Sequence, residues 1–316
     1  MEQAELIWMN GEFVAWEDAK VHVLTHGLHY GTGVFEGIRC YDTESSGPAV
    51  FRHGDHLDRL YKSAELYYMP IPFEREQLRE ATLELIGRNG FRDCYIRPLA
   101  FRGYGTMGLF PLDAPVDVTI AVWKWGAYLG DEGKANGIRA KVSSWERISP
   151  KSLIPHAKAT GQYLNSILAK LEAHHAGYEE AILLDHRGML CEGSGENIFV
   201  VRNGQVHTPP QAASILDGVS RRVTLTLAEE LGYEVVERDI ARAELSLADE
   251  VFLTGTAAEL VPVREIDDRP VGSGEVGPVT RAMAVAFDDA LHGRNPAHRD
   301  WLDPVPAYAK AAATTS

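Results

Sequence analysis

Cysteine and long apolar runs are both scarce in this chain of 316 residues. Its only cysteines are Cys40, Cys94 and Cys191, and an odd, sparse set favours a reducing compartment over a disulfide framework. No apolar run approaches the about 20 residues that a membrane-spanning helix needs. The opening residues 1–14 lack a basic region followed by an apolar one, so we expect no signal peptide and a cytoplasmic protein.

Positive charge is also in deficit. The 31 Lys and Arg residues face 45 Asp and Glu, which gives a formal net charge of -14. An acidic balance of this size argues against nucleic acid or an anionic membrane surface as the partner. The length, with 45% hydrophobic residues, suits one large or two ordinary globular domains with a real core.

Short helices and strands follow each other along the chain. Apolar side chains recur at helical spacing in 55–68, 73–88, 161–174, 218–231 and 277–291. In the third of these segments the pattern predicts a buried face made of Leu164, Ile167, Leu168 and Leu171. Residues typical of strands fill 94–101, 116–123, 181–184, 197–201, 205–207 and 250–253. Mixed strands with segregated helices predict an α+β fold rather than a repeated βαβ winding.

Four glycines, at positions 126, 130, 133 and 137, interrupt this pattern with a polar stretch. Such stretches often join domains. We therefore predict a small α+β domain over 1–127, a linker over 128–137 and a large α+β domain over 138–302. The residues from about Asn295 onward are rich in Pro and Ala, so we expect the chain to be frayed there. We predict that residues 303–316 form a tail outside the large domain.

Two motifs point to chemistry that the surrounding sequence does not support. Gly103-Tyr-Gly105-Thr-Met-Gly108 matches the dinucleotide fingerprint, but the prolines at 111 and 115 cannot open the helix that this motif requires. We therefore expect a glycine loop there. The histidines at 22, 26, 29, 53 and 56 have no acidic or cysteine partner at zinc spacing, so we expect no metal site.

Lysine is rare, with nine in the chain, and Lys158 stands apart from the others. Small residues surround it in Ala157-Lys158-Ala159-Thr160-Gly161, which leaves room for a bulky ring. A lysine amine can form a Schiff base with an aldehyde cofactor, and a carboxylate such as Glu192 can keep a pyridine nitrogen protonated. A lysine before a helix is more often polar surface, and Glu192 alone reads equally as a turn residue. The spacing leaves these alternatives open.

Separated blocks of the chain, from Tyr30-Gly-Thr-Gly-Val-Phe-Glu-Gly-Ile-Arg39 to Gly277-Pro-Val-Thr280, resemble the branched-chain amino-acid aminotransferases. These are pyridoxal 5'-phosphate enzymes of fold type IV, with two domains and the D-amino-acid aminotransferase-like fold. The resemblance implies that Lys158 bonds the cofactor aldehyde, that Tyr163 contacts its phenolic oxygen and that Glu192 holds its pyridine nitrogen. It also places the family's phosphate arginine at Arg59. Gly218-Val219-Ser220 opens a predicted helix whose free amides favour an anion, and Thr256 offers a hydroxyl and an amide, so we expect these residues to complete the phosphate site.

The resemblance assigns the substrate-binding residues as well. The amides of Thr256 and Ala257, with the Tyr95 hydroxyl, would bind the α-carboxylate. Arg97 would pair with the second carboxylate of glutamate. Phe35, Gly37, Trp125 and Tyr128 would line the side-chain pocket, and a neighbouring subunit would supply Tyr30 and Leu109, which implies at least a homodimer. Taken alone, aromatic residues in strands are more often core, Arg59 is a helix-surface residue and Ser220 is an ordinary N-cap.

The implied reaction moves the amino group of leucine, isoleucine or valine to 2-oxoglutarate in two half-reactions. Small departures from the family pattern leave the ranking of these substrates open: Ser220 replaces a common threonine, Gln162 an asparagine and Leu109 a valine. A D-amino-acid or (R)-amine transaminase, or an aminodeoxychorismate lyase, would share the cofactor residues, but the Tyr95 and Arg97 pair with Gly255-Thr-Ala-Ala258 favours L-amino acids and glutamate. A non-catalytic binding protein is the remaining alternative, and it would not need Lys158.

Overall fold

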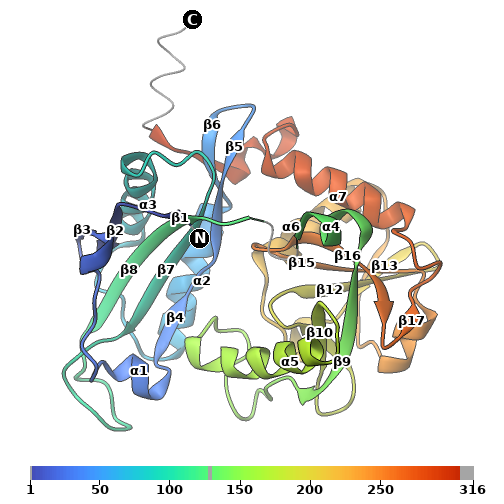
Figure 1. Cartoon of the computed structure of the whole chain (residues 1–316), viewed down its shortest axis with the longest axis horizontal. Helices are drawn as coiled ribbons and strands as arrows, with labels where there is room; N and C mark the ends of the chain where they lie inside the picture. Colours follow the sequence, from blue (N-terminus) through green and yellow to red (C-terminus); the bar gives the residue numbers. More distant parts are fainter. Residues whose placement is uncertain (1, 127–129, 307–316) are drawn as a thin grey trace, which may run out of the picture. The chain divides into compact units, whose positions relative to one another are not determined.

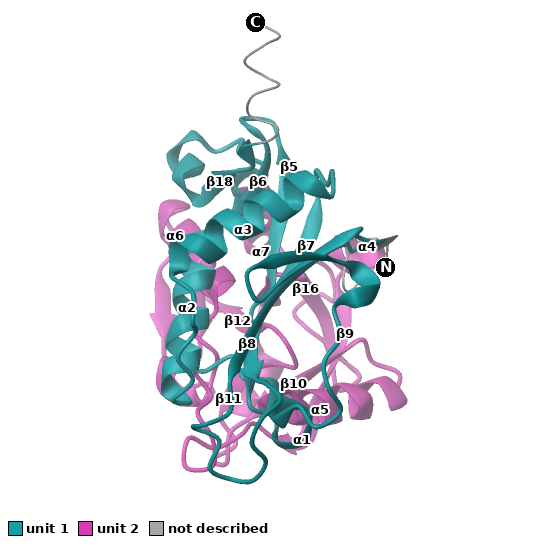
Figure 2. Cartoon of the chain, turned by 90° about the vertical axis from the view of Figure 1, so that its left-hand side faces the viewer, with its two compact units in different colours: residues 1–125, 157–161, 289–316 teal, residues 126–156, 162–288 magenta. Residues whose placement is uncertain are grey.

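The computed structural model describes residues 2–126 and 130–306 (Figure 1). The chain divides into two compact units (Figure 2). Unit 1 contains Met1–Trp125, Ala157–Gly161 and Asp289–Ser316, and unit 2 contains Gly126–His156 and Gln162–Asp288. Within the described ranges, no helix has both the length and the apolar character needed to cross a bilayer.

Unit 1 is built on a nine-stranded sheet of order β18-β6-β5-β7-β8-β2-β3, with β1 on β8 and β4 on β7. Its strands are β1 (Glu2–Gln3), β2 (Leu6–Met9), β3 (Glu12–Ala15), β4 (Gly33–Phe35), β5 (Ile38–Thr43), β6 (Gly47–Phe51), β7 (Cys94–Arg102), β8 (Val116–Lys124) and β18 (Leu302–Pro304). Its helices are the 3₁₀ helices η1 (Trp16–Asp18) and η5 (Pro296–Trp301) and the α-helices α1 (His26–Tyr30), α2 (His53–Leu66) and α3 (Arg75–Arg88).

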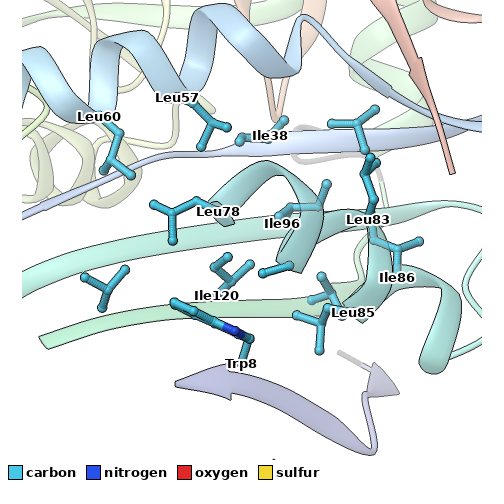
Figure 3. Close-up of a cluster of buried hydrophobic side chains, with 14 of the residues drawn as sticks. Trp8, Ile38, Leu57, Leu60, Leu78, Leu83, Leu85, Ile86, Ile96 and Ile120 are labelled. Carbon is cyan, nitrogen blue, oxygen red and sulfur yellow. The ribbon is translucent and has the colours of Figure 1, made fainter. Parts of the chain in front are cut away.

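The core of unit 1 forms where α2 and α3 cover one face of this sheet (Figure 3). Leu57 and Leu60 of α2 lie one turn apart, so they point to the same side of the helix. They meet Ile38, Ile96 and Ile120, which come from three adjacent strands, and all five side chains are fully buried. The apolar periodicity of both helices is therefore confirmed, because it selects the face that meets the sheet.

Unit 2 holds a second nine-stranded sheet, of order β11-β10-β9-β16-β15-β12-β13-β14, with β17 on β16. Its strands are β9 (Ile138–Glu146), β10 (Glu180–Leu184), β11 (Leu190–Gly193), β12 (Asn197–Arg202), β13 (Gln205–Thr208), β14 (Val235–Glu237), β15 (Glu250–Gly255), β16 (Glu259–Ile266) and β17 (Arg269–Pro270). Its helices are α4 (Gly130–Asn136), α5 (Tyr163–His175), α6 (Val219–Glu230), η3 (Gln211–Ala213) and η4 (Arg242–Leu247); η2 (Thr160–Gln162) and α7 (Pro278–Leu291) lie partly in it.

Parallel pairs (β9 with β10 and β16, β13 with β14) stand beside antiparallel pairs in this sheet. A hairpin turn at Asn203-Gly204 joins β12 to β13, and both residues have the positive φ, 51° and 77°, that such a turn requires. The sheet of unit 1 is antiparallel in all its pairs, and the sheet of unit 2 is mixed. Both have helices packed on them, which confirms the predicted α+β class.

The division into units differs from the predicted domains in three places. The predicted linker contains α4, within a part of the chain that the contacts assign to unit 2. Residues 157–161 return to unit 1, because Ala159 bridges to Val34 of β4. The chain also returns to unit 1 after Asp288.

The expectation of a frayed end from Asn295 is wrong for residues 296–305. Proline at the first position of η5 suits a helix start, and β18 pairs with β6. Leu302 and Val305 are buried. Apolar burial and strand pairing therefore order this segment in spite of its composition.

The predicted buried face of α5 is also wrong. Leu164, Ile167, Leu168 and Leu171 are 67%, 50%, 42% and 47% exposed. The residues that α5 buries are small, namely Ser166, Ala169 and Ala173, and the helix packs on β9 and β10. Small side chains let a helix approach a sheet closely, and the leucines are left on the outer face.

The fingerprint-like segment Gly103–Gly108 is a loop, as predicted. It follows β7, and no helix occurs before β8 begins at Val116. Gly108 has a φ of 108°, a conformation that suits glycine, and Leu109 is 91% exposed.

Candidate active site

Lys158 is fixed to the core of unit 1 through its backbone. Its carbonyl accepts a hydrogen bond of 3.0 Å from the Phe35 amide, and its own amide donates to Ser63 Oγ at 3.1 Å. The flanking Ala157 and Ala159 are buried. The Lys158 Nζ lies 5.1 Å from the centre of the Phe35 ring. The small residues beside Lys158 therefore allow its backbone to be buried. Its amine lies over the ring of Phe35.

A buried cluster of charged side chains lies in the same part of unit 1. Arg59 grips the Glu36 carboxylate with two donors, Nε to Oε1 at 2.7 Å and Nη2 to Oε2 at 2.8 Å. His56 Nδ1 lies 2.7 Å from Glu36 Oε2. Two donors of Arg59 thus serve Glu36, so the pair positions Arg59 and partly cancels its charge.

The titration of this cluster follows from burial and pairing. Burial raises the pKa of Glu36, but the Arg59 guanidinium and then His56 oppose it strongly enough to hold the pKa well below its usual range. Burial lowers the pKa of His56, with smaller contributions from the positive Arg59 and Lys158, against the opposing effect of Glu36. Glu36 is therefore a carboxylate, and His56 favours its neutral form.

Arg97 lies in an aromatic enclosure. Its guanidinium carbon is 4.8 Å from the centre of the Phe35 ring, 5.3 Å from Tyr95 and 5.7 Å from Trp123, distances typical of cation–π contacts. The Trp125 ring contacts Tyr95 edge-on at 4.6 Å. The Arg97 Nε is buried and has no hydrogen-bond partner among residues 2–126 and 130–306. A desolvated cation with an unused donor favours an anionic ligand.

Gly37 allows the close approach of Tyr95 to this enclosure. A Cβ atom at position 37 would lie 2.0 Å from the Tyr95 hydroxyl oxygen and 3.0 Å from its Cζ. Any larger residue would displace the ring. The structure therefore gives a steric reason for glycine at this position. It also brings together Phe35, Gly37, Tyr95, Arg97 and Trp125, which the resemblance assigns to the substrate site.

Glu192 is held in unit 2 at the end of β11. Its Oε1 lies 2.7 Å from Arg147 Nε in an ion pair that is almost fully buried. Its Oε2 accepts hydrogen bonds from Asn197 Nδ2 at 3.1 Å and from the Leu216 amide at 3.0 Å. One cation and two hydrogen-bond donors, from three segments, fix the carboxylate, so it has a defined direction as well as a charge.

The start of α6 lies beside this carboxylate. Gly218 is its N-cap residue, and Val219 and Ser220 in its first turn are buried. A Cβ at Gly218 would lie 2.0 Å from Asn197 Oδ1, and Asn197 also contacts Glu192. The free amides of a helix N-terminus favour an anion. The predicted opening of a helix at Gly218 is confirmed.

Thr256 and Ala257 form the turn between β15 and β16 with Ala258. The turn lies against the hairpin of Glu192, because a Cβ at Gly255 would lie 3.3 Å from Glu196 Cγ and 3.3 Å from the Gly195 carbonyl oxygen. Burial, together with the charge of Glu180, raises the pKa of Glu196 to about 8, although Lys170 opposes the rise. Thr256 and Ala257 are half-buried, so their amides lie beside the Glu192 hairpin.

The remaining predicted residues lie at the surface or outside the described ranges. Tyr30 ends α1 and is 42% exposed. His26 links α1 to the glycine loop, because its Nε2 lies 2.8 Å from the Gly108 carbonyl oxygen, and the exposed Leu109 follows. Tyr163 is half-buried at the start of α5. Tyr128 lies outside the described residues.

Several residues that hold these groups were not predicted from the sequence, namely Glu36, His56, Ser63, Arg147 and Asn197. One signal was available for those on α2. His56, Arg59 and Ser63 are spaced at i, i+3 and i+7, so they share a helix face with one another, and all three are buried. Polar residues at core spacing on an amphipathic helix indicate a buried polar site. Arg147 offered no such local signal, since its partner Glu192 is far along the chain.

Comparison with known proteins assigns the family. Residues 33–266 match the Amino-transferase class IV family. The chain is 49% identical over 305 residues to the branched-chain-amino-acid aminotransferase of Salmonella typhimurium, covering 96% of this chain and 98% of that protein.

Solved structures agree with this match. The crystal structure of the Escherichia coli branched-chain amino acid aminotransferase superposes with a TM-score of 0.94 at 49% identity, covering 96% of this chain and 100% of that one. The branched-chain amino acid aminotransferase from Thermobaculum terrenum, solved in its PLP-form, gives a TM-score of 0.89 at 37% identity, covering 96% of this chain and 99% of that one. The resemblance inferred from the sequence is thus confirmed: this chain belongs to the class IV aminotransferases, in the group of the branched-chain-amino-acid aminotransferases.

Proposed function

We propose that the protein moves the amino group of a branched-chain L-amino acid to 2-oxoglutarate with pyridoxal 5'-phosphate as cofactor. The observation that carries this proposal is the enclosure of Arg97. Its aromatic rings suit a branched aliphatic side chain, while its buried Nε lacks a partner in the described part of the chain. One pocket can therefore accept leucine and also pair with the second carboxylate of glutamate.

The donor groups fit a pyridoxal-type cofactor. Bound there, the cofactor would supply an aldehyde for an amine and an electron sink for the substrate Cα. Lys158 would bond the aldehyde, Tyr163 would contact the phenolic oxygen and Glu192 would hold the pyridine nitrogen protonated. Arg59, Gly218, Val219, Ser220 and Thr256 would bind the phosphate. The three groups that fix Glu192 keep its carboxylate oriented.

Lys158 also moves the proton in this proposal. Displaced by the incoming amino acid, its neutral amine would take the proton from the substrate Cα and deliver it to the C4′ carbon of the cofactor. The hydrogen bonds of its backbone with Phe35 and Ser63 fix the point from which the side chain of Lys158 extends. The same steps in reverse with 2-oxoglutarate give ping-pong kinetics.

Thr256 and Ala257 would bind the substrate α-carboxylate through their amides, with help from the Tyr95 hydroxyl. Phe35, Gly37, Trp125 and Tyr128 would surround the side chain. An (R)-amine without a carboxylate would leave the turn amides and the Tyr95 hydroxyl unused, so these roles favour an amino acid as the substrate.

A homodimer is part of the proposal. Unit 1 exposes large apolar side chains in two linked segments, which include Leu28, Tyr30, Leu109 and Phe110. A cavity of about 360 Å³ lies in the same unit and is lined mostly by apolar residues. Exposed apolar area of this kind marks an interface. The neighbouring subunit would contribute Tyr30 and Leu109 to the site.

Arg97→Leu tests the dual-substrate account. Losing a charge-assisted hydrogen bond should cost about 1.5–3 kcal/mol, or roughly ten- to a hundredfold in the half-reactions of glutamate and 2-oxoglutarate. Leucine does not use this charge, so its half-reaction should change much less. Single-turnover kinetics of each half-reaction measure the difference, with Arg281→Leu as control because Arg281 is an exposed residue of α7.

Equal losses for leucine and glutamate in Arg97→Leu would refute the role of Arg97. A panel of L- and D-amino acids with 2-oxoglutarate tests the proposed function itself. Preferential reaction of D-amino acids would favour the alternative transaminase of the same fold.

A further inference from the structure

Glu259 holds a backbone conformation that residues with a Cβ rarely adopt. It opens β16 with a φ of 59° and pairs across the hairpin with Gly255, so Thr256, Ala257 and Ala258 form the turn between them. Glycine or asparagine usually occupies such a left-handed position. Strain of this kind at a candidate site points to a function.

The side chain of Glu259 explains why glutamate is useful there. It is only 11% exposed and forms an ion pair with Lys134 of α4, which is 40% exposed. Figure 1 shows α4 beside β16, and contacts join the two elements. Glycine would relieve the backbone but would lose this ion pair. Glu259 therefore supplies a carboxylate that connects the turn to α4.

The two ends of the turn are thus restrained in different ways. At the Gly255 end, the turn packs on Glu196 and on the Gly195 carbonyl, and Thr254 pairs with Asn197 of β12. At the other end, the ion pair holds Glu259 in its left-handed conformation. The directions of the turn amides depend on the backbone angles between these two restraints.

We propose that Glu259, held by Lys134, is a positioning residue that aims the amides of Thr256 and Ala257 at the substrate α-carboxylate. This inference rests on the proposed function, which assigns those two amides to the carboxylate. It extends that function to a pair of side chains that need not touch the substrate.

The test uses the holoenzyme with Glu259→Gln, Lys134→Gln, the double variant and Glu259→Gly. We expect each to raise the KM for leucine, and the inhibition constant of 4-methylvalerate, by about tenfold through misplacement of the amides, with kcat changed much less. 4-Methylvalerate suits this test because it keeps the carboxylate and side chain of leucine without the amine. The double variant should be no worse than either single variant, because both remove one interaction.

Glu259→Gly separates positioning from stability. It removes the backbone strain, so its thermal unfolding midpoint should stay closer to the wild-type value than that of Glu259→Gln, while its KM defect should remain. Asp268→Gly is the matched control, because Asp268 also has a left-handed φ of 60° but lies in the hairpin of β16 and β17. Its KM should be that of the wild type.

Unchanged KM and inhibition constants in Glu259→Gln and Lys134→Gln would overturn the inference, as would a fall in kcat alone. A wild-type enzyme that does not react with leucine would instead overturn the proposed function, and the inference with it.

Discussion

The close approach of Tyr95 to Gly37 predicts a clear effect of adding one methyl group at position 37. In Gly37→Ala the new Cβ would lie 2.0 Å from the Tyr95 hydroxyl oxygen, which must retreat by about 1.4 Å to reach the 3.4 Å of ordinary contact. Overpacking of this kind costs about 1–3 kcal/mol of stability. A displaced hydroxyl would also lose the hydrogen bond that we propose it donates to the substrate α-carboxylate, worth about 0.5–1.5 kcal/mol, or roughly two- to tenfold in the KM for leucine.

Thermal unfolding and steady-state kinetics with leucine measure both effects. Gly54→Ala is the matched control, because a Cβ at this position of α2 meets no atom within 4 Å and alanine in a helix stabilises by roughly 0.5–1 kcal/mol. Its unfolding midpoint should rise and its KM should not change.

Tyr95→Phe supplies a second check by removing the closest contact. The remaining approach would be to Cζ at 3.0 Å, so Gly37→Ala should destabilise the Tyr95→Phe protein less than it destabilises the wild type. If Gly37→Ala leaves both the unfolding midpoint and the KM at wild-type values, the close approach of Tyr95 to Gly37 is refuted.

Three further predictions follow from the charged groups. Lys158→Ala should abolish transamination, and borohydride should no longer fix cofactor to the chain; retained fixation would identify another lysine. Glu192→Gln should bind cofactor but react slowly in single turnovers, because a neutral amide does not keep the pyridine nitrogen protonated, and a near-normal rate would exclude this role. Burial raises the pKa of Glu36, but Arg59 and His56 lower it below the 4.5 of an unfolded glutamate, so this group stabilises the fold above pH 4.5 and loses that effect as pH falls. The unfolding midpoint should therefore decrease on acidification below pH 4.5, and more steeply than in Glu36→Gln.

Local periodicity predicted the helices and strands well but did not predict which surface each helix covers. In α2, Leu57 and Leu60 are both the apolar stripe and the buried face. In α5 the apolar stripe of Leu164 and Ile167 is exposed, while Ala169 and its small neighbours face the sheet. The periodicity of apolar residues identifies the apolar side of a helix. Whether small residues instead pack closely on a sheet depends on strands that lie far away in the sequence.

Long-range partners explain the other differences as well. The ion pairs of Glu36 with Arg59 and of Glu192 with Arg147 join residues 23 and 45 positions apart, and no spacing rule relates them. The pairing of β18 with β6 joins segments about 250 residues apart. Lys158 and Gly218 lie inside short segments of sequence. The resemblance and the helix pattern could therefore assign them expected roles without knowledge of distant partners.

The ion pair of Arg59 with Glu36 limits what Arg59 can contribute to the proposed phosphate site. Its Nε and Nη2 already donate to Glu36, so the bidentate edge that usually binds a phosphate is occupied, and the carboxylate offsets part of the positive charge. The first turn of α6 carries no such compensating acid, since its buried residues are Val219, Ser220 and Arg221. If both groups bind the phosphate as proposed, its affinity should therefore depend more on the N-terminus of α6 than on the charge of Arg59.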